Sequence, residues 1–311
     1  MHPRAASFHQ GVRLPAILIV LALAGCGPGG EPSGRLVIAA GARGGVYYAY
    51  ARALALQLRL KDPRLRVTVV ATSGSVDNLR RVAAGSATIA FTAEDAAADS
   101  NLPIAALARV YDDYLHLVVP AAGPRRSIAQ LAGTAVSVGP QGSGTRLMVD
   151  RLLAVAGAHA SRLHIAELSL DASVAALRRR AIQAFFWSGG VPTPGVARLA
   201  RAEPLRLLPL GSLAGPLQAR FGPVYRAAEI PAGTYGLTGE VATIAVPNLI
   251  VARPGADAAL IRLVVATLFA RRTAIARAVP AAAALDRRAA IETAPVPLHA
   301  AALRWFRDTK P

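Results

Sequence analysis

A short apolar run, a turn rich in Gly, Ser or Thr and then a helical pattern follow one another four times in this chain of 311 residues. The four turns are GARGGVYY (41–48), TSGSVDN (72–78), GPQGSGT (139–145) and FWSGGVPTP (186–194). Apolar runs that alternate with helical patterns are typical of α/β folds with a largely parallel sheet. The sequence therefore predicts an α/β protein and places a polar turn at the start of several helices.

The order of the remaining segments supports the same fold class. Strands are expected at 35–40, 65–72 and 87–92, with helices at 45–60 and after Ser75, which can cap the second helix. Apolar runs at 104–111 and 114–122 predict two further strands, and residues 241–253 predict a strand pair interrupted at Pro247. A second strand and helix set begins near residue 134, and helices are expected from residue 257 to the tail.

The N-terminal segment has the pattern of an export signal. Arg4 and Arg13 precede an apolar run at 14–25, which is too short to span a bilayer comfortably. The letters LAGC, which end at Cys26, resemble the lipobox of bacterial lipoproteins, and the alternative is a plain signal peptide with an incidental cysteine. We expect a signal peptide at 1–25, a lipidated Cys26 and a flexible tether at 26–34. Because Cys26 is the only cysteine, an intrachain disulfide is excluded.

The net charge of +17 does not indicate a nucleic-acid-binding protein. The basic residues are scattered, their longest run is RRR at 178–180, and no aromatic stripe lies between them. A positive surface still raises the local concentration of anionic solutes and anionic lipid headgroups.

The four turns could together form a ligand site. The first N–H groups of a helix have no partner within the helix and carry a partial positive charge, and glycine allows a ligand to approach the backbone closely. Four helix starts that converge between two lobes would make a cleft for an anionic group. The alternative is that each turn uses Gly and Ser only for steric reasons. The candidate ligand-binding residues are Arg43, Gly44, Gly45, Tyr47, Tyr48, Thr72, Ser73, Gly74, Ser75, Asn78, Glu94, Ser143, Gly144, Thr145, Phe186, Ser188, Gly189 and Thr193.

Some of these candidates have a second interpretation. Arg43 could pair with a carboxylate or lie in solvent. We expect one of Tyr47 and Tyr48 to pack in the core and the other to face the cleft. Glu94 could receive an ammonium group, although the sequence slightly favours Glu94 and Asp95 as exposed acids at a helix N-terminus.

Signatures of catalysis and of metal binding are missing from the sequence. Ser143 lacks the first glycine of a G-x-S-x-G elbow, and neither GSGTRL nor GARGG continues as a P-loop. No pair of histidines has H-x-x-x-H spacing, and His116 alternates with leucines as a core or edge histidine would. We expect no catalytic residue, no metal site and no cofactor.

The joint pattern resembles the TAXI-type solute receptors of tripartite ATP-independent periplasmic (TRAP) transporters. The likeness is carried by GGVYY, by TSGSVDNLRRVAAGSATIAF, by VSVGPQGSGT, by AFFWSGGVPTPGVARLA, and by IPAGTYG with VATIAVPNLIVAR. It covers most of residues 35–253. The resemblance implies a two-lobed periplasmic-binding-protein type II fold, in which each lobe is a mixed, mostly parallel sheet flanked by helices, with a hinge and a central cleft.

The resemblance also implies domain limits and a function. Residues 35–120 and 236–311 would form lobe 1, with the last helices returning to it, and residues 121–235 would form lobe 2. The protein would be a periplasmic, membrane-anchored lipoprotein that binds a small organic anion, either a carboxylate or an amino acid such as glutamate, and delivers it to a TRAP membrane permease. A binding lipoprotein of an ATP-driven importer, a solute sensor for a membrane kinase and an exported enzyme are the alternatives.

Overall fold

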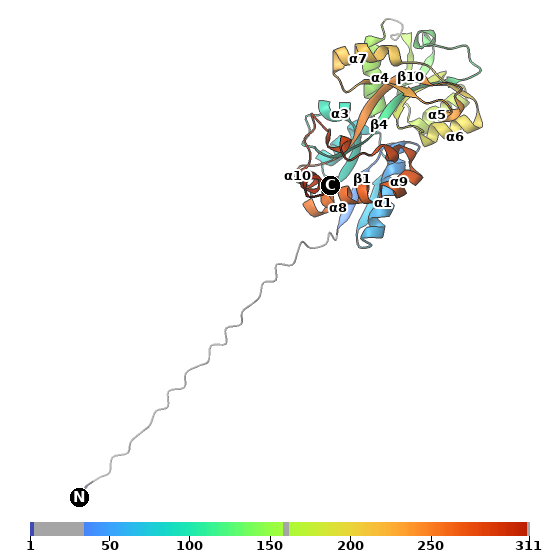
Figure 1. Ribbon diagram of the computed structural model, residues 1–311. Helices are drawn as coiled ribbons and strands as arrows, with labels where there is room; N and C mark the ends of the chain where they lie inside the picture. Colours follow the sequence, from blue (N-terminus) through green and yellow to red (C-terminus); the bar gives the residue numbers. More distant parts are fainter. Residues whose placement is uncertain (3–33, 158–161, 310–311) are drawn as a thin grey trace. The chain divides into compact units, whose positions relative to one another are not determined.

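Two lobes share one sheet in the computed structural model, which describes residues 1–2, 34–157 and 162–309. Strands β4 (Ala105–Pro120) and β10 (Val241–Ala252) are long and belong to both lobes. Lobe 1 further contains β1 (Arg35–Ala39), α1 (Val46–Lys61), β2 (Arg66–Val70), α2 (Ser75–Ala83), β3 (Ile89–Ala93), α3 (Glu94–Asp99), α8 (Ala258–Ala270), α9 (Arg272–Ala278), η5 (Pro280–Ala284), η6 (Ala289–Ile291) and α10 (Ala300–Asp308). Figure 1 shows α1, α8, α9 and α10 around this lobe.

Lobe 2 contains the middle of the chain, and Figure 1 shows α4 to α7 around it at the other end of β4 and β10. Its elements are η1 (Ile128–Leu131), β5 (Ala135–Ser137), α4 (Gly144–Val155), β6 (His164–Ala166), α5 (Leu170–Arg178), β7 (Ala184–Gly189), α6 (Pro194–Ala202), β8 (Leu205–Leu207), η3 (Gly211–Leu213), α7 (Ala214–Phe221), β9 (Arg226–Ile230) and η4 (Thr234–Gly236). The boundaries at residues 120/121 and 235/236 stay a prediction.

The sheet has the strand order β2-β1-β3-β10-β4-β7-β5-β6, with β8 paired to β4 and β9 paired to β10. Strands β1, β2 and β3 are parallel to one another, as are β5, β6 and β7, whereas β10 and β4 run antiparallel to their neighbours. The predicted α/β fold with two lobes, each with a mixed and mostly parallel sheet, is confirmed.

Each lobe has its own hydrophobic core. Helix α1 buries Tyr50, Leu54 and Leu58, spaced four residues apart, in a cluster that also contains α8 and α10. The last helices therefore pack against α1. A separate cluster in lobe 2 joins α4 to β7 and α7. Fully burying one such aliphatic or aromatic side chain stabilises the fold by about 1.5–3 kcal/mol.

Two predicted strand breaks are wrong. Strand β4 continues through Asp112 and Asp113, because β10 pairs with this segment along its length. The two carboxyl groups also lie in different surroundings. Asp112 accepts a hydrogen bond from Arg109 at 2.8 Å, whereas Asp113 is buried. Strand β10 likewise continues through Pro247. One side of β10 pairs with β9 at residues 241–245 and with β3 at residues 248–252, so Pro247 lies between two partners, where no N–H is required.

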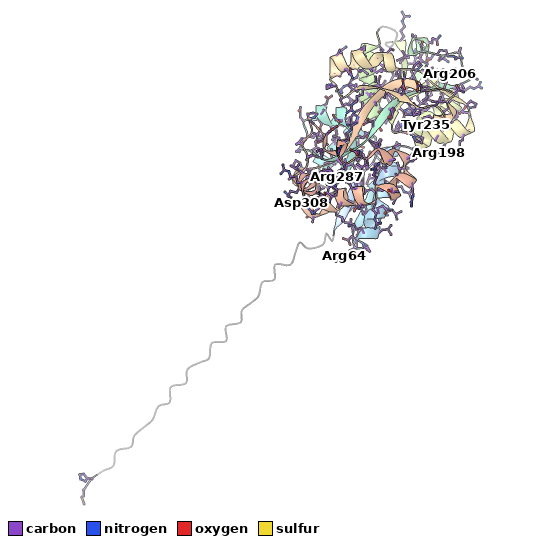
Figure 2. All side chains as sticks on the ribbon, in the orientation of Figure 1. Arg64, Arg198, Arg206, Tyr235, Arg287 and Asp308 are labelled. Carbon is purple, nitrogen blue, oxygen red and sulfur yellow. The ribbon has the colours of Figure 1, made fainter. Side chains whose placement is uncertain are left out.

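Basic residues are distributed over the fold. Figure 2 labels Arg198 and Arg206 in lobe 2 and Arg64 and Arg287 in lobe 1. Among the helices of the described residues, none is long and apolar enough to cross a bilayer.

Candidate functional site

A small cavity lies where the starts of α1, α2 and α4 meet strands β4 and β7. The space open to water-sized molecules is about 30 Å³, which is room for about two waters. The cavity is lined by Gly41, Ala42, Gly45, Val46, Tyr47, Ser73, Gly74, Ser75, Tyr111, Asp113, Ser143, Gly144, Thr145, Trp187, Ser188 and Gly189.

The start of α1 forms one wall of the cavity. Gly45 is the N-cap of this helix, and a Cβ atom at Gly45 would lie 3.2 Å from the Trp187 ring and 3.2 Å from the Ala42 carbonyl oxygen. Glycine is therefore required here so that Trp187 of lobe 2 can approach the helix. Tyr47, in the first turn, stacks on Phe91 and donates its hydroxyl hydrogen to Asn248 Oδ1.

The start of α2 faces the start of α4. Gly74, the N-cap of α2, has a φ of 128°, which a side chain rarely adopts, and a Cβ atom there would lie 3.3 Å from Ser143 Cα. Ser75 is the first residue of the helix rather than its cap, which corrects the sequence prediction. Its hydroxyl instead accepts a hydrogen bond from the Ala93 N–H at 3.0 Å, which ties α2 to the end of β3.

The start of α4 provides a third set of N–H groups. Ser143 caps the helix by accepting from the Arg146 N–H at 3.0 Å. The Thr145 hydroxyl accepts from the Ser188 N–H at 3.1 Å, so the helix start is fixed to the end of β7. Three helix N-termini therefore border one cavity, and each favours negative charge nearby.

Strands β4 and β10 supply polar groups at the base of the cavity. Tyr111 and Asp113 line it, and Asn248 lies opposite Tyr111 in the strand pairing. All three residues are buried, with exposed fractions of 3%, 4% and 0%. Within the described part of the chain, Tyr111 Oη, Asp113 Oδ1 and Asn248 Nδ2 have no hydrogen-bond partner. The side chains of Asn248 and Tyr111 lie near enough to the Asp113 carboxyl to lower its pKa, so the three form one polar group at the base of the cavity. Buried polar atoms are rarely left without a hydrogen bond of good geometry, and a ligand could complete the bonds of this group.

Asp113 is the acidic residue in the cavity lining, and none of the lining residues among those described is Arg, Lys or His. Burial raises the pKa of Asp113 to about 8, because a desolvated carboxylate is disfavoured, and the neighbouring Asn248 opposes this increase. The carboxylates of Asp112 and Asp95 raise the pKa further. Asp113 is therefore mostly protonated at neutral pH.

Trp187 forms the wall of the cavity opposite α1, and hydrogen bonds on the side away from the cavity hold its ring in place. Trp187 Nε1 donates to Thr193 Oγ1 at 3.0 Å, and the Thr193 N–H donates to Tyr235 Oη at 2.6 Å. Tyr235 Oη lies 3.1 Å from His116 Nε2. Burial lowers the pKa of His116 to about 4, so its ring is neutral, and Nδ1 lies near the carbonyl oxygens of Tyr114 and Trp187. We assign the proton to Nδ1, which leaves Nε2 to accept from Tyr235.

The two lobes contact each other on both sides of the cavity. The Gly195 N–H at the start of α6 donates to the Gly44 carbonyl oxygen at 2.9 Å. On the other side, the Asp77 N–H of α2 donates to the Gly142 carbonyl oxygen at 3.0 Å. These contacts flank the cavity between the lobes.

Ten of the predicted site residues lie together in the cavity lining. They are Gly45, Tyr47, Ser73, Gly74, Ser75, Ser143, Gly144, Thr145, Ser188 and Gly189. Their role in binding a ligand stays a prediction.

The other eight predicted residues lie outside the lining. Arg43 is exposed, and its guanidinium donates to Tyr48 Oη at 2.8 Å. Thr72 donates to Asn78 Oδ1 at 2.5 Å, and Asn78 in turn donates to the Phe91 carbonyl oxygen, so both residues support the turn before α2. The remaining four have other structural positions: Gly44 in the contact between lobes, Phe186 in the lobe 2 core, Thr193 behind Trp187, and Glu94 in α3.

The prediction that Glu94 and Asp95 are exposed acids is wrong. Their exposed fractions are 8% and 2%, because α3 packs between β10 and α2. Burial raises the pKa of Glu94 to about 7, and the charges of Arg109 and Arg226 oppose the increase. The Asp95 carboxylate accepts a hydrogen bond from Tyr225 at 2.8 Å.

Sequence reasoning missed six lining residues, namely Gly41, Ala42, Val46, Tyr111, Asp113 and Trp187. Gly41, Ala42 and Val46 lie within or next to the first predicted turn, and Trp187 lies within the fourth. Tyr111 and Asp113 had one available signal, which is the alternation of residues 111, 113 and 115 on one face of a strand. The export signal, the tether and the predicted lipidation of Cys26 lie outside the described residues.

The fold is similar to that of two solved structures. The alkanesulfonate-binding protein SsuA from Xanthomonas axonopodis pv. citri, bound to MOPS, has a TM-score of 0.52 and 17% identity over 91% of this chain and 86% of its own. PhnD1 from Prochlorococcus marinus, in complex with methylphosphonate, has a TM-score of 0.52 and 12% identity over 75% of this chain and 83% of its own. At these identities the likeness concerns the fold, and it agrees with the two-lobed type II architecture.

The match at the level of sequence families covers nearly the whole of the described fold. Residues 38–309 match the NMT1-like family. This range begins in β1, ends beyond α10 and includes the three helix starts, both shared strands and the complete cavity lining. The chain belongs to the NMT1-like family.

Proposed function

We propose that this protein is an exported solute-binding protein that holds a small organic anion between its lobes. The observation that carries the proposal is the convergence of three helix N-termini on one cavity flanked by contacts between the lobes. The fold shared with an alkanesulfonate-binding protein bound to MOPS and with a methylphosphonate complex supports it, since MOPS and methylphosphonate both bear an acidic oxyanion group.

The helix starts account for anion binding without a basic side chain. One helix N-terminus stabilises an adjacent negative charge by about 0.3–1 kcal/mol at an exposed site and by up to about 2 kcal/mol when partly buried. The α1, α2 and α4 starts approach the same space, so their contributions act on the same ligand group. A carboxylate, a sulfonate and a phosphonate all fit this chemistry.

Entry of a solute requires the lobes to separate. The cavity has room for about two waters, which is fewer than the non-hydrogen atoms of an organic acid. The contacts Gly195–Gly44 and Asp77–Gly142 join segments from different lobes, and strands β4 and β10 are the connections through which the lobes can bend. Hinge closure around a ligand is a common mode of such two-lobed proteins, and the ligand favours the closed form through contacts made only there.

We further propose that the solute is passed to a membrane permease by a lipid-anchored periplasmic receptor. The TAXI-like motifs favour a TRAP permease, whereas an ATP-driven importer and a membrane kinase are alternatives that the same fold can serve. Copurification from solubilised membranes tests this step. A TRAP permease in the eluate supports the proposal, and an ATP-binding transporter subunit or a kinase would contradict it.

A thermal-shift screen of the purified chain against carboxylates, sulfonates, phosphonates and amino acids tests solute binding. A ligand at 100 times its dissociation constant should raise the free energy of unfolding by about 2.7 kcal/mol. The uncharged amide of each active acid serves as the control, and it should produce a much smaller shift. No shift with any of the acids would contradict the proposal of an anion site.

A further inference from the structure

The proposed anion site leaves the polar groups at the base of the cavity without a role. Asp113 Oδ1 and Tyr111 Oη are buried, line the cavity and have no hydrogen-bond partner among the described residues. The third unpartnered atom, Asn248 Nδ2, has a fixed orientation, because Asn248 Oδ1 already accepts from Tyr47. The cavity therefore has a second polar region besides the helix starts, and it contains an acid.

A simple anion fits this second region poorly. It would bring a negative charge into a small cavity that already holds Asp113 and that has no basic side chain in its described lining. While Asp113 is protonated, a simple anion supplies no hydrogen-bond donor to the buried acceptor oxygens of Asp113 and Tyr111. Once Asp113 ionises, two like charges in one desolvated site disfavour each other, and nothing in the lining compensates. A solute that carries its own positive charge removes this conflict, because its ammonium group neutralises the carboxylate.

We infer that Asp113 recognises an ammonium group, and that the solute is a small zwitterion whose acidic group binds at the starts of α1, α2 and α4. This inference rests on the proposed function and names the class of solute for the same site. An ammonium group donates up to three hydrogen bonds, and Asp113 Oδ1 and Tyr111 Oη can accept two of them. A hydrogen bond between two charged groups is about twice as strong as one between neutral groups.

The chain contains its own reporter for the test. It has two tryptophans, of which Trp187 lines the cavity and Trp305 stacks on Phe269 in lobe 1. Replacing Trp305 with Phe leaves Trp187 as the single tryptophan, so its fluorescence follows binding at the cavity. Titrations of the full-length Trp305→Phe protein then give a dissociation constant for each compound.

Three matched sets of compounds separate an ammonium group from a neutral donor and from no donor. They are alanine, lactate and propionate; taurine, isethionate and ethanesulfonate; and aminomethylphosphonate, hydroxymethylphosphonate and methylphosphonate. In the set whose acid the site accepts, the amine should bind at least about tenfold more tightly than the other two members. Equal binding of the amine and the hydroxyl compound would overturn the inference.

Substitution of Asp113 completes the test. Asp113→Asn should weaken the amine at least about tenfold and change its amine-free partner less than about threefold. The matched control is Asp112→Asn, since Asp112 is the next residue on the strand but pairs with Arg109 outside the cavity. If Asp113→Asn does not fold, Tyr111→Phe keeps the ring and removes only the second acceptor, and it should also weaken the amine selectively.

The outcomes distinguish this inference from the proposed function. Binding of all three members of a set with similar affinity, or equal weakening of all three by Asp113→Asn, would overturn the ammonium inference and leave the anion site intact. No binding by any of the nine compounds would count against the anion site and the inference together.

Discussion

The backbone N–H of Gly195 donates to the carbonyl oxygen of Gly44 at 2.9 Å, and this hydrogen bond joins the start of α6 in lobe 2 to the turn before α1 in lobe 1. The space between the two turns is small, since a Cβ atom at Gly195 would lie 3.2 Å from the Gly44 carbonyl oxygen. Glycine at position 195 leaves room for the two turns to meet. A side chain near this contact should therefore affect closure more than folding.

Gly45→Val should abolish ligand-induced thermal stabilisation while leaving the empty protein folded. The added side chain would contact the Trp187 ring and the Ala42 carbonyl oxygen, where a Cβ atom alone is already at 3.2 Å. The control is Gly215→Val, since Gly215 in α7 has open space around the position of a Cβ atom. The measurement is the melting temperature with and without the most active acid of the screen. An unchanged ligand response in Gly45→Val would refute the role of this glycine.

Asp113 should make the protein less stable as the pH rises from about 4 to about 8. Its pKa is about 8 in the folded chain, because of burial, and about 4 in the unfolded chain. Between these values the unfolded state releases the proton and the folded state keeps it, so the free energy of unfolding falls by up to about 1.4 kcal/mol per pH unit. Below pH 4 and above pH 8 the two states bind equal numbers of protons at this residue.

Denaturant unfolding of the wild type and of Asp113→Asn at several pH values tests this prediction. The charged or titratable neighbours that affect Asp113 are Asp112, Asp95 and Tyr111, and all remain in the variant. The difference between the two proteins should change over the pH window from 4 to 8 and level off above it. A difference that does not vary with pH would show that Asp113 titrates as an ordinary exposed carboxyl group.

Tyr235→Phe should destabilise the protein by about 1–3 kcal/mol, since it leaves the buried Thr193 N–H and His116 Nε2 without their common partner. It should also shift the emission of Trp187, because Thr193 fixes the indole N–H. The control is Tyr48→Phe, whose hydroxyl contacts the exposed Arg43. Chemical unfolding and tryptophan emission spectra measure the two effects, and similar behaviour of both variants would rule out the proposed support of Trp187.

Arg151→Met should cost about 3 kcal/mol or more, because it removes the cation from a buried group that joins α3 to lobe 2. Arg151 donates to Tyr225 Oη at 2.7 Å, and Tyr225 donates to Asp95 Oδ2 at 2.8 Å. The double variant with Asp95→Asn should lose less stability than the sum of the two single variants. The control is Arg262→Met, whose ion pair with Asp308 is about half exposed and should contribute at most about 1 kcal/mol. Additive losses would mean that Arg151 and Asp95 act independently.

Much of the fold could be predicted from local patterns, because the strands, turns and helices of α/β units each have a signal within a short stretch of sequence. Prediction from such stretches fails at residues 112–113 and at Pro247, where strand breaks are expected and the strands continue. Two adjacent acids and a proline both indicate a loop when judged alone. Here Arg109 pairs with Asp112, burial keeps Asp113 protonated, and Pro247 lies at the change from one neighbouring strand to another. The burial of Asp113 and the strand partners of Pro247 depend on segments far away in the chain, which a short window does not contain.

The lining residues in the turns could be predicted from the sequence, whereas those at the base of the cavity could not. Gly45, Gly74 and Ser143 lie at helix starts, and helix starts carry a signal in the sequence. The sequence pattern predicts a loop between two strands at Asp113, whereas this residue lies inside β4 and lines the cavity. Glu94 follows a strand end, as a site residue would, but it lies in α3 and outside the cavity lining.

The strands β4 and β10 have a consequence for how proteins of this kind can be recombined. Each strand pairs with elements of both lobes, so any exchange of one lobe between relatives needs two junctions inside strands, near the base of the cavity. A chimera joined there would change the residues around Asp113 and Asn248 as well as the lobe itself. An exchange of one lobe should therefore change both the ligand preference and the bending between the lobes. Neither property should be transferable without the other.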